Sequence, residues 1–209
     1  MSMTVNIQRT DGWTGAYQQE NLQAISDWLT HLEPRQLFRR ASLCIAGKDA
    51  VSLIATRHIA WIDVHTDEPY EMVFRRVPAY GYVDEACAIL GRAAFLAELE
   101  AAKYRWRSEF AGSSKAGQPF EALIEVLFEG GFEYYIEIKG RLASDSERVS
   151  LLNGLLEQGT FLIRLPTGGF TMINTRNVTR ARIYQSHNAE RTPPATLFAE
   201  ALDDDLARI

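Results

Sequence analysis

Apolar residues in the first third of the chain change their spacing from one segment to the next. Between positions 19 and 32 they recur every three or four residues, which predicts a helix with one apolar face that ends before Pro34. Shorter apolar runs predict strands, and a turn around Gly47 joins two of them. The predicted strands are residues 4–10 at a sheet edge, the hairpin 43–45 and 51–55, and residues 59–65.

The middle of the chain is richer in alanine. After a further strand predicted at residues 70–77, residues 83–104 carry apolar side chains at helical spacing, which predicts the longest helix. Its alanine-rich side favours the close approach of another element, either within the core or in a dimer. The small and flexible residues at 111–119 are typical of a surface loop or a domain boundary.

Residues 120–139 alternate strictly between apolar and polar positions, which predicts a β-hairpin. A two-residue turn would pair Phe128 with Glu133 and mix the two faces of the hairpin. A three-residue loop, 129–131, instead pairs Phe128 with Phe132 and keeps one face wholly apolar. The same register pairs Val126 with Tyr134 and Ile124 with Ile136.

The other face of this hairpin is predicted to be acidic. In the three-residue-loop register Glu125 opposes Tyr135, and Glu121 opposes Lys139 as a favourable pair. We expect these glutamates to form a solvated surface and not a metal site.

Two distant segments of the chain match without a gap. Residues 41–65 align with residues 160–184, with four identities and a matching order of apolar and polar positions. A helix between Asp145 and Gly159 precedes the second segment, as the first helix precedes the first one. This repetition predicts an internal duplication, whose function would lie at the seam between the copies or where they differ.

The predicted fold class is therefore α+β, with two related helix-plus-antiparallel-sheet units joined by a long helix. Each unit alone buries too little apolar surface to offset its ordering entropy, so we expect the two sheets to share a core. The predicted units are 1–80 and 119–190, with the long helix and a linker at 81–118 and a C-terminal tail or helix at 191–209.

Composition and charge exclude few classes of protein. The chain has 209 residues, of which 46% are hydrophobic, and a net charge of −5, so no global positive field attracts a polyanion. No apolar stretch is long enough for a membrane span. Cys44 and Cys87 are predicted to be buried free thiols, and the chain is predicted to be cytoplasmic.

Asp63, His65 and Asp67 alternate at the end of a predicted strand, so their side chains would point to one face. Carboxylates and an imidazole are suitable ligands for a divalent metal ion. The alternative is a strand that simply ends in a solvated turn.

Arginines gather in the second half of the chain. Arg180 and Arg182 project from one side of a predicted strand, and Arg164 and Arg176 are expected near them. Guanidinium groups can bind phosphate in a bidentate manner, which allows an RNA or anion site. The alternative that we prefer is structural: this basic strand meets the acidic strand that contains Asp63, either within the chain or between subunits.

The run LIATRHIAWI at residues 53–62 resembles the second motif of bacterial Sm-like proteins, in which an extended segment ends in Lys-His and a strand follows. Residues 172–181 repeat this arrangement. The resemblance implies a small-barrel fold of a helix and strongly bent strands. It also implies RNA contacts at Arg57 and His58.

No G-x-S-x-G turn, Walker sequence or dinucleotide-binding fingerprint occurs in the chain. A non-catalytic cytoplasmic binding or assembly module that self-associates is therefore the first functional hypothesis, with no cofactor expected. An Sm-like RNA-binding protein is the second hypothesis, and a metal-dependent hydrolase that uses the Asp63 cluster is the third.

Overall fold

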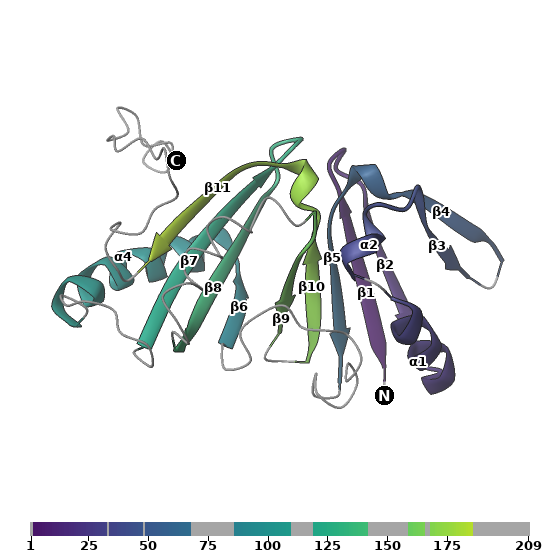
Figure 1. The fold of residues 1–209 in the computed structure, drawn as a ribbon, viewed down its shortest axis with the longest axis horizontal. Helices are drawn as coiled ribbons and strands as arrows, with labels where there is room; N and C mark the ends of the chain where they lie inside the picture. Colours follow the sequence, from purple (N-terminus) through teal and green to yellow (C-terminus); the bar gives the residue numbers. More distant parts are fainter. Residues whose placement is uncertain are drawn as a thin grey trace.

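The computed structural model is an α+β protein whose described strands form three antiparallel sheets (Figure 1). It describes residues 2–32, 34–47, 49–67, 86–109, 119–141, 159–165 and 168–185. The first half contains β1 (Met3–Arg9), β2 (Thr14–Gln19), α1 (Leu22–His31), α2 (Pro34–Leu37), β3 (Ser42–Ala46), β4 (Val51–Ala55), the 3-10 turn η1 (Thr56–His58) and β5 (Ile59–Thr66). The second half contains β6 (Ala86–Leu90), α4 (Arg92–Glu109), β7 (Pro119–Phe128), β8 (Glu133–Arg141), β9 (Phe161–Arg164), β10 (Gly169–Ile173), the 3-10 turn η2 (Thr175–Asn177) and β11 (Val178–Gln185).

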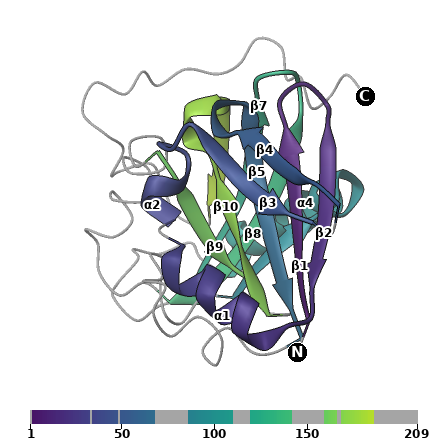
Figure 2. The same ribbon diagram turned by 90° about the vertical axis from the view of Figure 1, so that its right-hand side faces the viewer.

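The largest sheet combines strands from both halves of the chain. Its order is β2-β1-β5-β10-β9, and a second sheet has the order β11-β7-β8-β6. β3 and β4 form a separate two-stranded sheet, which runs obliquely in front of β1 and β5 when the molecule is viewed from that end (Figure 2). The two halves are therefore joined by the ladder between β5 and β10.

Two groups of three strands have the same pairing register. Met3 pairs with Thr66 in the β1–β5 ladder, and Ala122 pairs with Gln185 in the β7–β11 ladder, each residue 119 positions later. The same offset of 119 relates every pair of the β1–β2 ladder to a pair of the β7–β8 ladder. Both long ladders also skip one residue near the same end, at Ala60 and at Thr179. This is the offset of the sequence match between residues 41–65 and 160–184.

The register predicted for the hairpin at residues 120–139 is confirmed. Phe128 donates its N–H to the carbonyl oxygen of Phe132 at 2.9 Å, and Val126 pairs with Tyr134. The loop requires a left-handed residue, which Gly131 supplies at φ 82°. Gly12 has φ 90° at the corresponding place in the β1–β2 turn.

Side chains from both halves contribute to the same hydrophobic cores, as expected. One cluster packs Met172 of β10 with Ile62 of β5 and with Ile25 of α1. A second cluster packs Ala60 of β5 with Ile136 of β8 and Ile173 of β10. Burial of each of these isoleucine and methionine side chains stabilises the fold by about 1.5–3 kcal/mol.

The prediction of a solvated acidic face on the second hairpin is wrong for Glu125, which is 2% exposed. α4 covers this face, because Phe95 and Leu99 of the helix pack against Leu123 and Tyr135. The buried carboxylate of Glu125 lies 3.7 Å from the guanidinium of Arg182, its partner across the ladder.

The predicted long helix begins later than expected. Residues 86–90 form β6, which pairs with β8, and α4 starts at Arg92 after Gly91. A short run of alanine and aliphatic residues is compatible with a buried strand as well as a helix, so its spacing could not decide between them.

The N-terminal strand is not at a sheet edge, contrary to the prediction. β1 lies between β5 and β2, and the sparse apolar pattern of residues 14–19 had given no sign of β2. The first helix is correspondingly shorter and begins after Asn21, whose side chain accepts a hydrogen bond from the N–H of Ala24 at 3.1 Å.

Cys44 is exposed, so its predicted burial is also wrong. It lies on the outer face of β3, whereas the adjacent Leu43 points into the core. Among the helices that the structure describes, none has the length and apolar character needed to cross a bilayer. The strand predicted at 70–77, the linker 111–118, the helix between Asp145 and Gly159 and the tail 191–209 lie outside the described residues, except for Gly159 itself.

Gly169 allows the β5–β10 ladder to close. It has φ +103°, and a Cβ at this position would overlap the carbonyl oxygen of Val64. We expect Gly169→Ala to lower the free energy of unfolding by about 3 kcal/mol or more, because backbone strain and the overlap both act. Urea unfolding measures this change.

Gly131→Ala is the matched control, since Gly131 has φ +82° but no atom within 4 Å of an added Cβ. We expect it to cost about 1–2 kcal/mol from backbone strain alone. Equal losses in the two variants would show that the overlap at Val64 does not limit the junction.

Candidate functional site

The junction between the two halves is a five-residue antiparallel ladder. Phe170 pairs with Val64, and Met172 pairs with Ile62. All four of these side chains are fully buried. One face of the junction is therefore apolar and buried, and the ladder joins residues that are more than 100 positions apart.

Asp63 lies at the polar centre of this junction. Its carboxylate accepts hydrogen bonds from Thr171 Oγ1 at 2.7 Å, Tyr134 Oη at 2.9 Å and Trp61 Nε1 at 3.2 Å. Burial and the nearby Asp63 charge raise the pKa of Tyr134 far above its ordinary value, so its hydroxyl remains a donor. The carboxylate thus connects β5 to β10 and to β8.

Two asparagine side chains tie η2 to the start of β5. Asn174 Nδ2 and Asn177 Nδ2 both donate to the carbonyl oxygen of Ile59, at 2.9 and 2.8 Å. Asn177 also donates to the carbonyl oxygen of Arg57 at 2.9 Å. Because both asparagine side chains are buried, these bonds supply the partners that their amide donors need.

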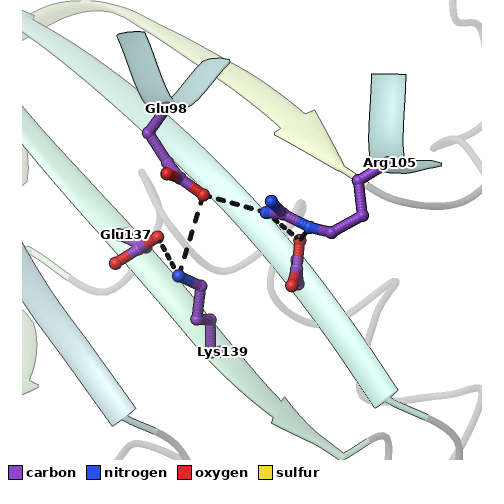
Figure 3. Close-up of polar contacts among 5 residues, drawn as sticks. Glu98, Arg105, Glu137 and Lys139 are labelled. Carbon is purple, nitrogen blue, oxygen red and sulfur yellow. Dashed lines mark hydrogen bonds and ion pairs between the residues drawn. The ribbon is translucent and has the colours of Figure 1, made fainter. Parts of the chain in front are cut away.

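A second polar cluster joins α4 to the sheet beneath it (Figure 3). Arg105 bridges Glu98 at 2.9 Å and Glu121 at 2.7 Å. Lys139 lies 2.5 Å from Glu137 and 3.7 Å from Glu98. The hydrogen bond from Arg105 lowers the pKa of Glu98, and the hydrogen bond to Glu137 raises the pKa of Lys139. Their paired charges indicate a structural role in holding α4.

β4 presents an exposed apolar edge. Leu53 is 71% exposed and Val51 is 64% exposed, whereas Met172 and Phe170, which lie 119 positions later, are fully buried. β4 pairs with β3 alone among the described strands, so within the described residues no strand pairs with its other edge, and the backbone N–H and C=O groups of such an edge can pair with another strand. Such an edge is a template for another strand.

β11 also forms the edge of its sheet, since β7 is its one described neighbour. β3 and β4 lie at one end of the long axis of the molecule, and β11 lies in the opposite half (Figure 1). The two edges therefore face different parts of the surroundings.

The structure does not bring the predicted metal ligands together. Asp63 is engaged at the junction, and Asp67 accepts a hydrogen bond from the backbone N–H of Ser2 at 2.8 Å. Among the described residues, which include His65, no three His, Cys, Asp or Glu side chains gather closely enough to hold a metal ion. The Asp63 cluster therefore has no geometric support as a metal site.

The predicted arginine cluster is divided between two sheets. Arg164 lies on β9 of the five-stranded sheet, whereas Arg180 and Arg182 lie on β11 of the four-stranded sheet. The basic strand β11 does not pair with the acidic strand β5 within the chain, so this form of our structural hypothesis is wrong. The reason is that β5 already pairs with β1 on one side and with β10 on the other.

The remaining predicted anion contacts lie in the two 3-10 turns. Arg57 and Arg176 are exposed, and Arg57 Nε donates to His58 Nε2 at 2.9 Å. The hydrogen bond from Asn177 to the carbonyl of Arg57 holds η1 and η2 next to each other. Exposed arginines of the two halves are therefore presented from adjacent turns.

Sequence reasoning missed Tyr134, Thr171, Asn174 and Asn177 as junction residues. For the two asparagines, the sequence offers one signal: in the alignment of residues 41–65 with 160–184, Asn177 lies opposite His58 and Asn174 lies opposite Ala55. No protein-family model, curated protein or solved structure matches the chain. The function must therefore be inferred from the geometry of these surfaces.

The lowered pKa of Glu98 gives stability a pH dependence. In the folded state Glu98 releases its proton at lower pH than in the unfolded state, whose pKa is near 4.5. The unfolded state binds more protons in this window, so the free energy of unfolding falls as the pH drops below about 4.5.

We expect Glu98→Gln to be less stable than the wild type at neutral pH and to lose less stability between about pH 6 and pH 3. Denaturant unfolding at a series of pH values measures both effects. Glu100→Gln is the control, because the Glu100 side chain is 75% exposed on the same helix. Parallel pH profiles of the wild type and Glu98→Gln would contradict the assignment.

Proposed function

We propose that the protein is a non-catalytic module that assembles with further copies of itself. The observation that carries this proposal is the exposed apolar edge of β4, whose counterpart β10 is buried at the junction. Isolated apolar residues on a surface are common, but an apolar strand edge with unpaired backbone groups favours strand addition. The main charged groups of the described part are engaged in structural contacts, as Asp63 and Arg105 illustrate.

We further infer that the two halves arose by duplication of one unit. The shared offset of 119 residues in three pairs of matched features supports this inference: the hairpin ladders, the long ladders and their bulges. Both units also continue from a hairpin through a 3-10 turn into a long strand. The exposed free thiol of Cys44 fits a cytoplasmic, reducing location for such a module.

Sm-like RNA binding is the second candidate function. It is favoured by the adjacent turns η1 and η2, which present Arg57 and Arg176 at the surface. Guanidinium groups on adjacent turns can contact phosphates of one nucleic-acid strand.

For RNA binding, we expect Arg57→Ala combined with Arg176→Ala to weaken the affinity for single-stranded RNA. We also expect the affinity to depend less steeply on salt, with a slope smaller by about 0.7 for each phosphate that the variant no longer neutralises. Fluorescence anisotropy at several salt concentrations measures both quantities. Arg39→Ala combined with Lys103→Ala removes the same charge elsewhere and should change the affinity less. Undetectable binding of wild-type protein at low salt would remove this candidate.

For self-association, we expect Leu53→Lys to weaken assembly by about tenfold or more, because a charged edge residue opposes strand addition. Sedimentation over a range of protein concentrations measures the association constant. Leu22→Lys is the control, since Leu22 is 58% exposed on α1 and lies away from the strand edge. A wild-type chain that stays monomeric at all accessible concentrations would contradict the proposed function.

A further inference from the structure

We propose that copies of the chain join head to tail, with β4 of one copy pairing antiparallel to β11 of the next. This inference rests on the proposed self-association and names the surfaces and the register that it uses. Its basis is the junction within the chain, where β10 of the second unit pairs with β5 of the first. Residues 119 positions apart match in the two units, so β4 corresponds to β10 and β11 corresponds to β5.

The junction within the chain specifies the register of the joint between copies. Phe170 pairs with Val64 and Met172 pairs with Ile62 in the observed ladder. The corresponding residues are Val51 with Ile183, and Leu53 with Ala181. The complete inferred ladder is Val51 with Ile183, Ser52 with Arg182, Leu53 with Ala181 and Ile54 with Arg180, each pair formed between two copies.

The exposure of the two edges supports this assignment. Val51 and Leu53 are exposed where Phe170 and Met172 are fully buried. Ile183 and Ala181 are half-buried where Val64 and Ile62 are fully buried. All four positions that the internal junction buries are therefore less buried at these two edges, each of which has one described neighbour, as expected for an interface between copies.

The polar positions of the joint are also complementary. In the internal ladder the hydroxyl of Thr171 lies opposite the charged Asp63 and donates to it. In the joint between copies the hydroxyl of Ser52 lies opposite the charged Arg182 and can accept a hydrogen bond from it. Each joint thus places one hydroxyl against one charge of suitable sign.

One difference shortens the joint between copies. Gly169 begins the internal ladder with φ +103°, and a Cβ there would overlap the carbonyl oxygen of Val64. The corresponding residue is Ala50, which precedes β4 and carries a Cβ. The ladder between copies therefore begins one residue later, at Val51.

A second difference makes the joint between copies weaker than the internal one. Asn174 and Asn177 tie η2 to the first residues of β5. Ala55 and His58 occupy the corresponding positions, and the alanine side chain cannot donate a hydrogen bond. We therefore infer a joint that opens and closes with protein concentration, whereas the internal junction stays closed.

The joint is heterologous, because it uses a different surface on each copy. Repeated addition of this kind gives a ring if the rotation closes and an open filament if it does not. The two edges lie in opposite halves of the molecule (Figure 1), which leaves each free to meet a different neighbour.

Disulfide trapping tests the joint. In a background of Cys44→Ser and Cys87→Ala, Leu53→Cys and Ala181→Cys are placed in separate full-length chains, one of which carries a size tag. Directly opposed residues of an antiparallel ladder have Cα atoms about 4.5–5.5 Å apart, a distance that a disulfide bridges. We expect mild oxidation of the mixture to give one covalent heterodimer, and little covalent dimer from either chain alone.

Ser52→Cys mixed with Ala181→Cys is the register control. The side chain of residue 52 points to the opposite face of the strand, so this mixture should trap at least about tenfold less dimer. Circular dichroism checks that each variant keeps the wild-type fold, which we expect because Leu53 is exposed and Ala181→Cys is a small change.

The outcomes separate this inference from the proposed function. Trapping in the mixture alone supports the head-to-tail joint. A Leu53→Cys chain that forms a covalent dimer with itself, in a protein that sediments as an oligomer, overturns this joint in favour of β4–β4 pairing but keeps self-association. Oligomers without any trapped dimer also overturn the joint, and a protein that remains monomeric overturns both proposals.

Discussion

The pairing of β5 with β10 is the interaction on which the rest of the structure depends. β5 is the centre of the five-stranded sheet, and its two faces contribute to two hydrophobic clusters. If β10 separated from β5, the side chains of Phe170 and Met172 on β10 would return to water, at a cost of about 1.5–3 kcal/mol each as an upper estimate. The carboxylate of Asp63 would also lose its bond to Thr171. Apolar side chains thus give the junction most of its stability, and the hydrogen bonds of Asp63 favour one pairing of the two strands.

The two units share their ladders but differ in what covers them. Asn6 and Glu125 occupy matching positions, 119 residues apart. Asn6 is half-exposed, whereas Glu125 is buried on the face of the sheet that α4 covers. The helix is held there by apolar contacts of Phe95 and by the ion pairs of Arg105. One pattern of strand pairing therefore supports two different surfaces, because the sequences of the two halves differ at matching positions.

Local patterns allowed much of the fold to be predicted from the sequence, because alternation and repetition are visible within short windows. The register of the hairpin at 120–139 followed from keeping one face apolar, and it is confirmed. β6 was missed because an alanine-rich run fits helix and strand alike. The partners of Asp63 were missed for another reason: Tyr134 and Thr171 are distant in sequence and meet it through pairing that no local spacing encodes.

Under the proposed duplication and assembly, the residues that differ between positions 119 apart account for two joints of unequal strength. If β4 carried the counterparts of Gly169, Asn174 and Asn177, its edge would close as tightly on another molecule as β10 closes on β5, and assembly would occur at any concentration. Ala50, Ala55 and His58 remove the close approach and at least one side-chain donor, while Val51 and Leu53 retain apolar character. Since hydrophobic contact gives affinity and buried hydrogen bonds give fixed geometry, this combination favours an edge that associates reversibly.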